Sequence, residues 1–167
     1  MTADGEQPLY AFVEIPKGSR NKYEYDAQLG HVVLDRTLWT SVVYPADYGF
    51  LIDTLGRDGD PVDAVVLVAE PTFPGCVIPV EPIGVFEMRD EKGEDDKVLC
   101  VPFQDPKWSH MHDITDIRDS LLDEIAHFFD VYKDLETGKG TEIVGWRGRD
   151  HADAVVAAGL AAAAGSP

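Results

Sequence analysis

Three carboxylates fall within six residues in the segment Asp58-Gly-Asp-Pro-Val-Asp63, directly before a Val-rich run. Side chains alternate along a strand, so the last of these acids is expected on the same face as Val65 and Leu67. A carboxylate turned toward a core is costly unless a positive charge meets it. An Asp-rich surface turn would explain the first two acids but not the third. The segment therefore favours divalent-cation binding over a solvated loop.

The EF-hand calcium loop is the nearest alternative reading of this segment. Its spacing fails, because Pro61 occupies the fourth place and Asp63 stands where the loop requires glycine. Ala69 occupies the place of the bidentate glutamate. This loop is excluded.

A second acidic cluster spans Asp90-Glu-Lys-Gly-Glu-Asp-Asp-Lys97. Alone it is typical of a polar hairpin. Together with the first cluster it supplies hard oxygen ligands from separate strands, as two-metal phosphoryl chemistry requires. Carboxylates within about 5 Å of one another repel by roughly 3 kcal/mol per pair at an effective dielectric of about 20. Such crowding predicts divalent cations between the acids.

Basic residues are scarce, with 14 lysines and arginines against 31 acids and a formal charge of −17. The acidity either serves solubility alone or partly holds cations, and composition does not decide between these. It does oppose binding to nucleic acid or anionic lipid, which depends on lysine and arginine. An OB-like nucleic-acid-binding module would need a basic groove with stacking aromatics, and is disfavoured.

The cysteine and histidine motifs do not indicate a catalytic or metal site. Cys76 and Cys100 lie in apolar contexts and are interpreted as buried structural thiols. His110 and His112 share one side at strand spacing but lack further ligands nearby, which favours surface or inter-subunit histidines over zinc. The first residues show no signal-peptide pattern, and no segment has the roughly 20 apolar residues of a membrane span. A cytoplasmic protein is expected.

The elements that position these residues change character along the chain. Strands are predicted first, then a helix over 120–133 and a weaker helix over 152–164, in an Ala-rich tail that begins at about 152. This order predicts one α+β domain over 1–167 with a small closed or half-closed barrel. The predicted strands are 9–15, 22–25, 31–35, 62–69, 77–88 and 98–101.

Six motifs follow one another along about residues 9–147: Glu14-Ile-Pro-Lys, Asn21-Lys-Tyr-Glu-Tyr-Asp26, Tyr44-Pro-Ala-Asp-Tyr-Gly49, Asp58–Asp63, Asp90–Lys97, and His127-Phe-Phe-(x)2-Tyr-Lys-Asp-Leu-Glu-(x)-Gly-Lys139. In this order they resemble the family I soluble inorganic pyrophosphatases. The Asp58–Asp63 block resembles the family signature, and the sequence of residues 95–102 is closest to actinobacterial members.

That resemblance implies a five-stranded OB-like β-barrel with flanking helices, a cytoplasmic location and a homohexamer. It also implies Mg²⁺ as cofactor, with Mn²⁺ as a substitute. Asp60 matches the general base, a role also given to Asp95. The implied metal ligands are Glu14, Glu24, Asp58, Asp63, Asp90 and Asp95. The implied phosphate contacts are Lys22, Arg36, Tyr48, Lys97, Tyr132, Lys133 and Lys139.

The activity implied is hydrolysis of pyrophosphate to two orthophosphates by metal-activated water, without a covalent intermediate. Neither a Gly-x-Ser-x-Gly elbow nor a Gly-(x)4-Gly-Lys-Ser/Thr phosphate loop occurs in the sequence. A metal-dependent phosphatase acting on nucleotides or sugar phosphates is the alternative. The absence of an evident base-stacking pocket favours the smaller substrate.

Overall fold

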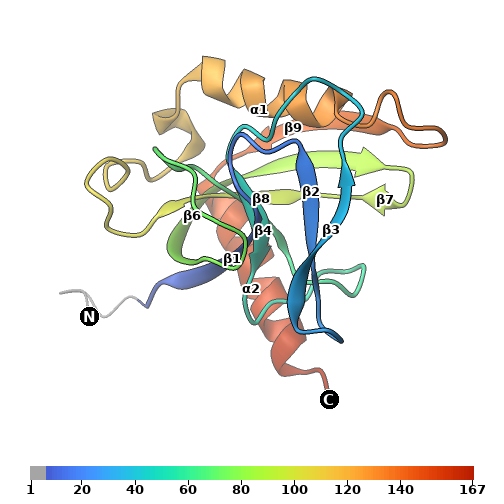
Figure 1. The fold of residues 1–167 in the computed structure, drawn as a ribbon. Helices are drawn as coiled ribbons and strands as arrows, with labels where there is room; N and C mark the ends of the chain where they lie inside the picture. Colours follow the sequence, from blue (N-terminus) through green and yellow to red (C-terminus); the bar gives the residue numbers. More distant parts are fainter. Residues whose placement is uncertain (1–6) are drawn as a thin grey trace.

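Nine strands and two α-helices form the part of the chain that the computed structural model describes, residues 7–167 (Figure 1). The segment examined for a signal peptide begins at residues 1–6, which lie outside this range. The elements are β1 Leu9–Ile15, β2 Asn21–Asp26, β3 His31–Thr37, β4 Asp47–Leu51, β5 Asp63–Val66, β6 Val77–Asp90, β7 Gly93–Glu94, β8 Lys97–Pro102, η1 Ile114–Asp116 (a 3₁₀ turn), α1 Asp119–Val131, β9 Thr141–Arg147 and α2 Arg149–Ala164.

Five strands close into a barrel in the order β1-β4-β5-β8-β6, because β6 pairs with β1 again. All pairs are antiparallel except β5 with β8, which run parallel. The predicted five-stranded barrel with flanking helices is therefore confirmed. β7 and β9 extend the sheet from β6, and β2 and β3 form a separate two-stranded sheet.

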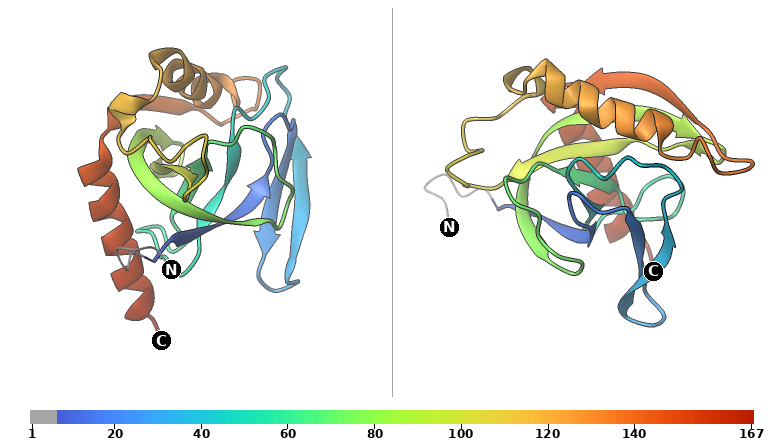
Figure 2. Two further views of the ribbon diagram at one scale, coloured as in Figure 1. Left: turned by 90° about the vertical axis from the view of Figure 1, so that its left-hand side faces the viewer. Right: turned by 45° about the horizontal axis from the view of Figure 1, so that its top comes forward.

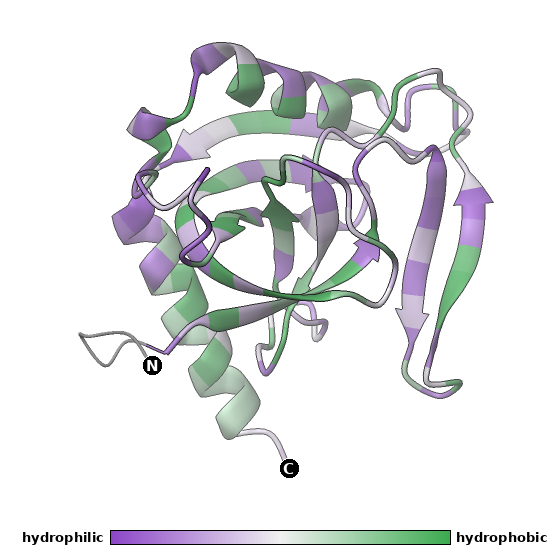
Figure 3. Ribbon diagram, turned by 60° about the vertical axis from the view of Figure 1, so that its left-hand side comes forward, coloured by the Kyte–Doolittle hydropathy of each residue, from purple (hydrophilic) through white to green (hydrophobic). Residues whose placement is uncertain are grey.

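The helices and the β2–β3 hairpin lie on different sides of the barrel. Figure 2 shows α1 beside β9 at one end, and α2 on the side away from the hairpin. The barrel strands carry alternating hydrophobic and hydrophilic residues, and the C-terminal half of α2 is largely hydrophobic (Figure 3). Each helix therefore packs against a different set of hydrophobic barrel residues.

Strand alternation divides the buried residues into two cores. In β5, Val65 and the following Leu67 belong to the core that contains α1, here called the α1 core. Ala64 and Val66 belong to the core that contains α2, here called the α2 core. The prediction that Asp63 faces the side of Val65 and Leu67 follows the same alternation and is confirmed by its contacts below.

A β-bulge at Glu14 lets β1 change core partway along its length. Val13 pairs with Gly49 and Ile15 with Tyr48, so Glu14 is the extra residue. Accordingly Val13 lies in the α2 core and Ile15 in the α1 core, although alternation alone would place both on one face. Gly49 is needed here, because an added Cβ would lie 1.8 Å from the Phe12 carbonyl oxygen.

The predicted elements are largely confirmed, but three strands were missed. The strands β4, β7 and β9 were not predicted; each contains a glycine, and β9 lies between the two helices rather than before them. β5 is shorter than the predicted 62–69, and α1 ends at Val131 rather than Lys133. The helix α1 begins at Asp119, one residue before its predicted start, and its N-cap is Arg118.

Candidate active site

The ammonium of Lys97 lies at the centre of a polar cluster where β4, β5 and β8 meet. Its Nζ is 3.1 Å from Asp63 Oδ2, 3.0 Å from Asp95 Oδ1 and 3.0 Å from the Tyr48 hydroxyl. The Tyr48 hydroxyl also donates to Asp63 Oδ2 at 3.0 Å. One buried cation therefore joins two acids and a tyrosine that three separate segments supply.

Lys97 reaches this position through the aromatic part of the α1 core. Its side chain is 1% exposed, and Nζ lies 5.2 Å from the ring centres of both Tyr48 and Phe129. Burial alone would lower the pKa of Lys97, but the charges of Asp63 and Asp95 raise it above its usual range. Burial beside the same acids raises the pKa of Tyr48 well above normal. Lys97 is therefore charged and Tyr48 is neutral.

Two acids of the cluster bind protons more tightly than usual. Burial raises the pKa of Asp95 to about 6 against the opposing effect of Lys97, and Asp63 adds to the rise. Burial likewise raises the pKa of Glu14 to about 7, with further contributions from Asp63 and Glu24. The Glu14 carboxylate accepts the Tyr25 backbone N–H at 2.7 Å, which tethers the hairpin to the β1 bulge. These raised pKa values indicate that Lys97 alone does not neutralise the acids around it.

Asp90 forms a second pair, at the end of β6. Its Oδ2 lies 3.2 Å from Lys133 Nζ, which is also 3.5 Å from Glu91 Oε1. Burial would raise the pKa of Asp90, but the Lys92 N–H and Lys133 lower it. Tyr132 lies in the α1 core, with its ring 5.4 Å from Lys133 Nζ. The turn after α1 thus brings Tyr132 and Lys133 to the acidic cluster.

The hairpin brings its own charged residues to one face through a second bulge. Lys22 pairs with Arg36 and Tyr23 with Leu34, so Asp35 is the extra residue and Arg36 returns to the face of Lys22. Lys22 Nζ lies 2.5 Å from Glu24 Oε1 and 3.6 Å from Asp35 Oδ2. Arg36 pairs with Asp35 and with Glu136.

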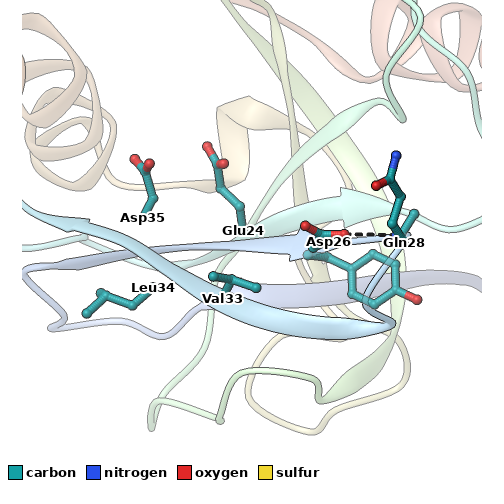
Figure 4. A pocket seen from close by; sticks show the side chains of 8 residues that line it. Glu24, Asp26, Gln28, Val33, Leu34 and Asp35 are labelled. Atoms are coloured by element: carbon teal, nitrogen blue, oxygen red, sulfur yellow. Dashed lines mark hydrogen bonds between the residues drawn. The ribbon is translucent and has the colours of Figure 1, made fainter.

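A hollow of about 560 Å³ lies on this hairpin rather than over Lys97. Figure 4 shows Glu24 and Asp35 directed to the same side of the hairpin. The remaining lining includes Asp26, Val33 and Leu34. Because its wall is acidic on one part and apolar on another, this hollow is ill suited to an anion, and we place the chemistry at Lys97.

Asp58 and Asp60 stand apart from these clusters. Both are exposed on a turn that Gly59 enters with φ +89°, and Asp58 Oδ1 accepts the Asp60 N–H at 3.0 Å. Within residues 7–167 neither acid forms an ion pair with a basic residue. Their position on the turn directly before β5 joins them to Asp63 through the chain.

The donor chemistry of the site fits a hard divalent cation. Asp63, Asp95 and Asp90 come from different segments and offer the carboxylate oxygens that such a cation prefers, each beside a lysine ammonium. Among the described residues no three acids, cysteines or histidines are grouped closely enough to hold one ion. The predicted six-acid ligand set therefore stays a prediction.

Glu136, in the turn after α1, had no role predicted from the sequence. It is 8% exposed, yet it is ion-paired to both Arg36 and Lys139. Its only local signal is the spacing of three residues to Lys139; the pairing with Arg36 spans 100 residues.

The cysteines and histidines set aside above lie away from this cluster. Cys100 is buried in the α2 core, which raises its thiol pKa, whereas Cys76 is half-buried. His110 and His112 are exposed, and His112 Nδ1 lies 3.4 Å from Glu81 Oε1. The prediction of a buried thiol is confirmed for Cys100 and is wrong for Cys76, which is only partly covered. No helix of residues 7–167 has the length and apolar character to span a membrane.

Comparisons with known proteins agree on one family. The sequence profile of the inorganic pyrophosphatases matches residues 11–164. The chain belongs to the inorganic pyrophosphatase family. It is 56% identical to an inorganic pyrophosphatase of Streptomyces coelicolor over 144 residues, covering 86% of this chain and 88% of that one. A Leifsonia xyli relative of the same name is 54% identical over 149 residues, or 89% and 91% of the two chains. The resemblance stated from the motifs, actinobacterial members included, is confirmed.

The fold gives the same assignment to the inorganic pyrophosphatase family. The crystal structure of the inorganic pyrophosphatase from Thermus thermophilus superposes with a TM-score of 0.93 at 43% identity. The alignment covers 98% of this chain and 95% of that one. The barrel and both helices are therefore those of the family.

Proposed function

We propose that this protein hydrolyses inorganic pyrophosphate to two orthophosphates. The observation that carries the proposal is the buried Lys97 ammonium between Asp63 and Asp95, with Lys133 on Asp90 beside it. Alternating acids and cations suit a substrate that is itself a compact polyanion accompanied by cations. The family membership supports the same activity.

Binding falls to the basic and tyrosyl groups around the cluster. Lys22 and Arg36 on the hairpin, with Lys133 and Lys139 after α1, would neutralise phosphoryl oxygens from two sides. The neutral hydroxyls of Tyr48 and Tyr132 would donate hydrogen bonds to them. Lys97, held by two acids, would stabilise charge on the departing phosphate. The reaction then needs positioning and charge neutralisation rather than a covalent intermediate.

The acidic residues would hold Mg²⁺, for which Mn²⁺ could substitute. The ligands we propose are Glu14, Glu24, Asp58, Asp63, Asp90 and Asp95. When bound, the ion neutralises phosphoryl charge and lowers the pKa of a coordinated water. Asp60 is the better candidate for accepting the water's proton, because Asp95 is committed to Lys97 whereas Asp60 is exposed and lacks an ion pair within residues 7–167.

Three broader statements belong to the same proposal. The resemblance supports a cytoplasmic homohexamer and one domain over the whole chain. The net charge of −17 supports the absence of nucleic-acid and anionic-membrane partners. Sedimentation of the purified protein would test the hexamer, since a monomer at micromolar concentration would contradict it.

A phosphate-release assay tests the activity. The purified protein is expected to release phosphate from pyrophosphate with Mg²⁺, and to lose this activity in chelator. ATP with Mg²⁺ is the matched substrate, expected to be hydrolysed much more slowly. Equal rates on the two substrates would favour the alternative nucleotide phosphatase. No release from pyrophosphate with Mg²⁺ in excess would overturn the proposal.

A further inference from the structure

Glu136, in the turn after α1, contacts two cations that the proposed function assigns to the substrate. Its Oε2 accepts Arg36 Nη2 at 3.1 Å, and its Oε1 lies 3.4 Å from Lys139 Nζ. Arg36 Nε is 2.5 Å from Oε1 with its N–H directed elsewhere, so this contact is an ion pair rather than a hydrogen bond. One carboxylate therefore orients a guanidinium from β3 and an ammonium near β9.

The three side chains lie in layers. The side chain of Glu136 is 7% exposed, that of Arg36 21% and that of Lys139 36%, so the carboxylate is the most deeply buried of the three groups. Burial would raise the pKa of Glu136, but Arg36 and Lys139 lower it, and the group stays ionised. A carboxylate that competed with substrate would lie outside the cations. This order fits a group that supports them.

The hairpin has particular need of such support. β2 and β3 form a sheet of their own beside the barrel (Figures 1 and 2). Glu14 tethers the hairpin at the Tyr25 N–H, and Glu136 tethers it at Arg36. The second tether is the one that acts directly on a predicted phosphate contact.

We propose that Glu136 is a positioning residue, which holds Arg36 and Lys139 in the arrangement that receives a phosphoryl group. The inference rests on the proposed function. It assigns to Glu136 no contact with substrate or metal. When Glu136 holds the Arg36 and Lys139 side chains in place before binding, the substrate does not have to order them, which reduces the entropy cost of binding. Loss of Glu136 should therefore weaken affinity more than turnover.

The test compares Glu136→Gln with Glu81→Gln in the Mg²⁺-loaded protein. Glu81 is the matched control, because its Oε1 also lies 2.5 Å from an arginine nitrogen, Arg149 Nη1, but at the N-terminus of α2. Glu136→Gln is expected to raise KM for pyrophosphate and Kd for inorganic phosphate about tenfold, the value of one charge-assisted hydrogen bond. The change in kcat should be smaller. Glu81→Gln should leave all three unchanged.

A double-mutant cycle adds a readout that lost stability alone would not move. With Arg36→Gln already present, adding Glu136→Gln should raise Kd for phosphate by about threefold or less, because only Lys139 is left for Glu136 to hold. A full tenfold loss in both backgrounds would overturn the inference. Should Glu136→Gln fail to fold, Glu136→Asp keeps the charge one methylene short and should give an intermediate KM.

Each result has one reading. Wild-type KM and phosphate Kd in Glu136→Gln would overturn the inference while leaving pyrophosphatase activity intact. Tighter phosphate binding would overturn it too, by making Glu136 a competitor for the cations. Wild-type protein that leaves pyrophosphate intact would instead defeat the proposed function.

Discussion

The two cores of this barrel differ in the side chains that fill them. The α1 core is rich in aromatic residues, among them Tyr44, Phe86, Phe128, Phe129 and Tyr132. The α2 core, as the structure describes it, consists of small and aliphatic residues such as Ala64, Val66 and Val156. The charged cluster lies on the α1 side, where rings surround the Lys97 ammonium.

This difference separates chemistry from stability. Tyrosine combines a large apolar ring with a polar tip, so Tyr48 and Tyr132 can fill a core and still present hydroxyls to a site. Valine and alanine offer only packing. The same strands contribute to both cores, because alternate residues of β5 face opposite cores. Substitutions on the two sides should therefore have different signatures.

The largest effect should follow Asp63→Asn. The amide keeps the shape and an acceptor for Tyr48 and Lys97 but removes the charge, so pyrophosphate turnover should fall by about 1,000-fold or more. In chelator, where no Mg²⁺ stabilises either protein, the melting temperature should change little. Asp53→Asn, an exposed acid at φ 60° after β4, is the control and should keep near-normal turnover. Normal turnover in Asp63→Asn would show that the charged cluster around Lys97 is not the catalytic site.

Magnesium should stabilise the folded protein next most strongly. Binding to the native state alone contributes RT ln(1 + [L]/Kd), about 2.7 kcal/mol at 100 times Kd. Melting curves with Mg²⁺ and with chelator measure this directly, and Asp63→Asn should lose most of the difference. Curves indifferent to both additions would show that the acids do not hold an ion.

In chelator, stability should fall as pH rises from about 5 to 8. Burial raises the pKa of Glu14 from its ordinary 4.5 to about 7 and the pKa of Asp95 from its ordinary 3.8 to about 6. In this window the folded form therefore binds more protons than the unfolded chain, and the free energy of unfolding decreases, by about 4 kcal/mol for the two groups together. Urea titrations at both pH values test the slope, which Glu14→Gln should flatten. A slope of opposite sign would refute the buried, cation-poor description of these acids.

The smallest effects give the sharpest comparison. Phe129→Leu in the α1 core and Val156→Ala in the α2 core should each cost about 1 to 2 kcal/mol of stability. Only Phe129→Leu should lower kcat/KM, by about three- to tenfold, because its ring supports Lys97. Chemical denaturation and the phosphate assay on the same preparations measure both. Equal kcat/KM losses would erase the distinction between the cores.

Much of the fold was predictable, because local patterns dictate most of its elements. Short β-like runs between turn residues, and one nearly continuous Val-rich run, predicted six strands, and the helical spacing of Leu121, Ile125 and Phe128 predicted α1. The strand β4 was not predicted because it contains Gly49, a poor strand former that the Glu14 bulge requires. β9 escaped because Gly145, at φ 143°, and a register shift interrupt its pairing with β6. Gly49 is selected by a non-local contact with the Phe12 backbone, and Gly145 by a backbone φ that favours glycine.

The sequence by itself determined the kinds of groups present and the direction of Asp63, because composition and alternation are local properties. Only the tertiary structure decided which cation meets which acid. Lys97 reaches Asp63 across 34 positions, Lys133 reaches Asp90 across 43, and Arg36 reaches Glu136 across 100. Strand pairing brings β8 beside β5, the turn after α1 brings Lys133 to Asp90, and the bulge at Asp35 returns Arg36 to the face of Lys22.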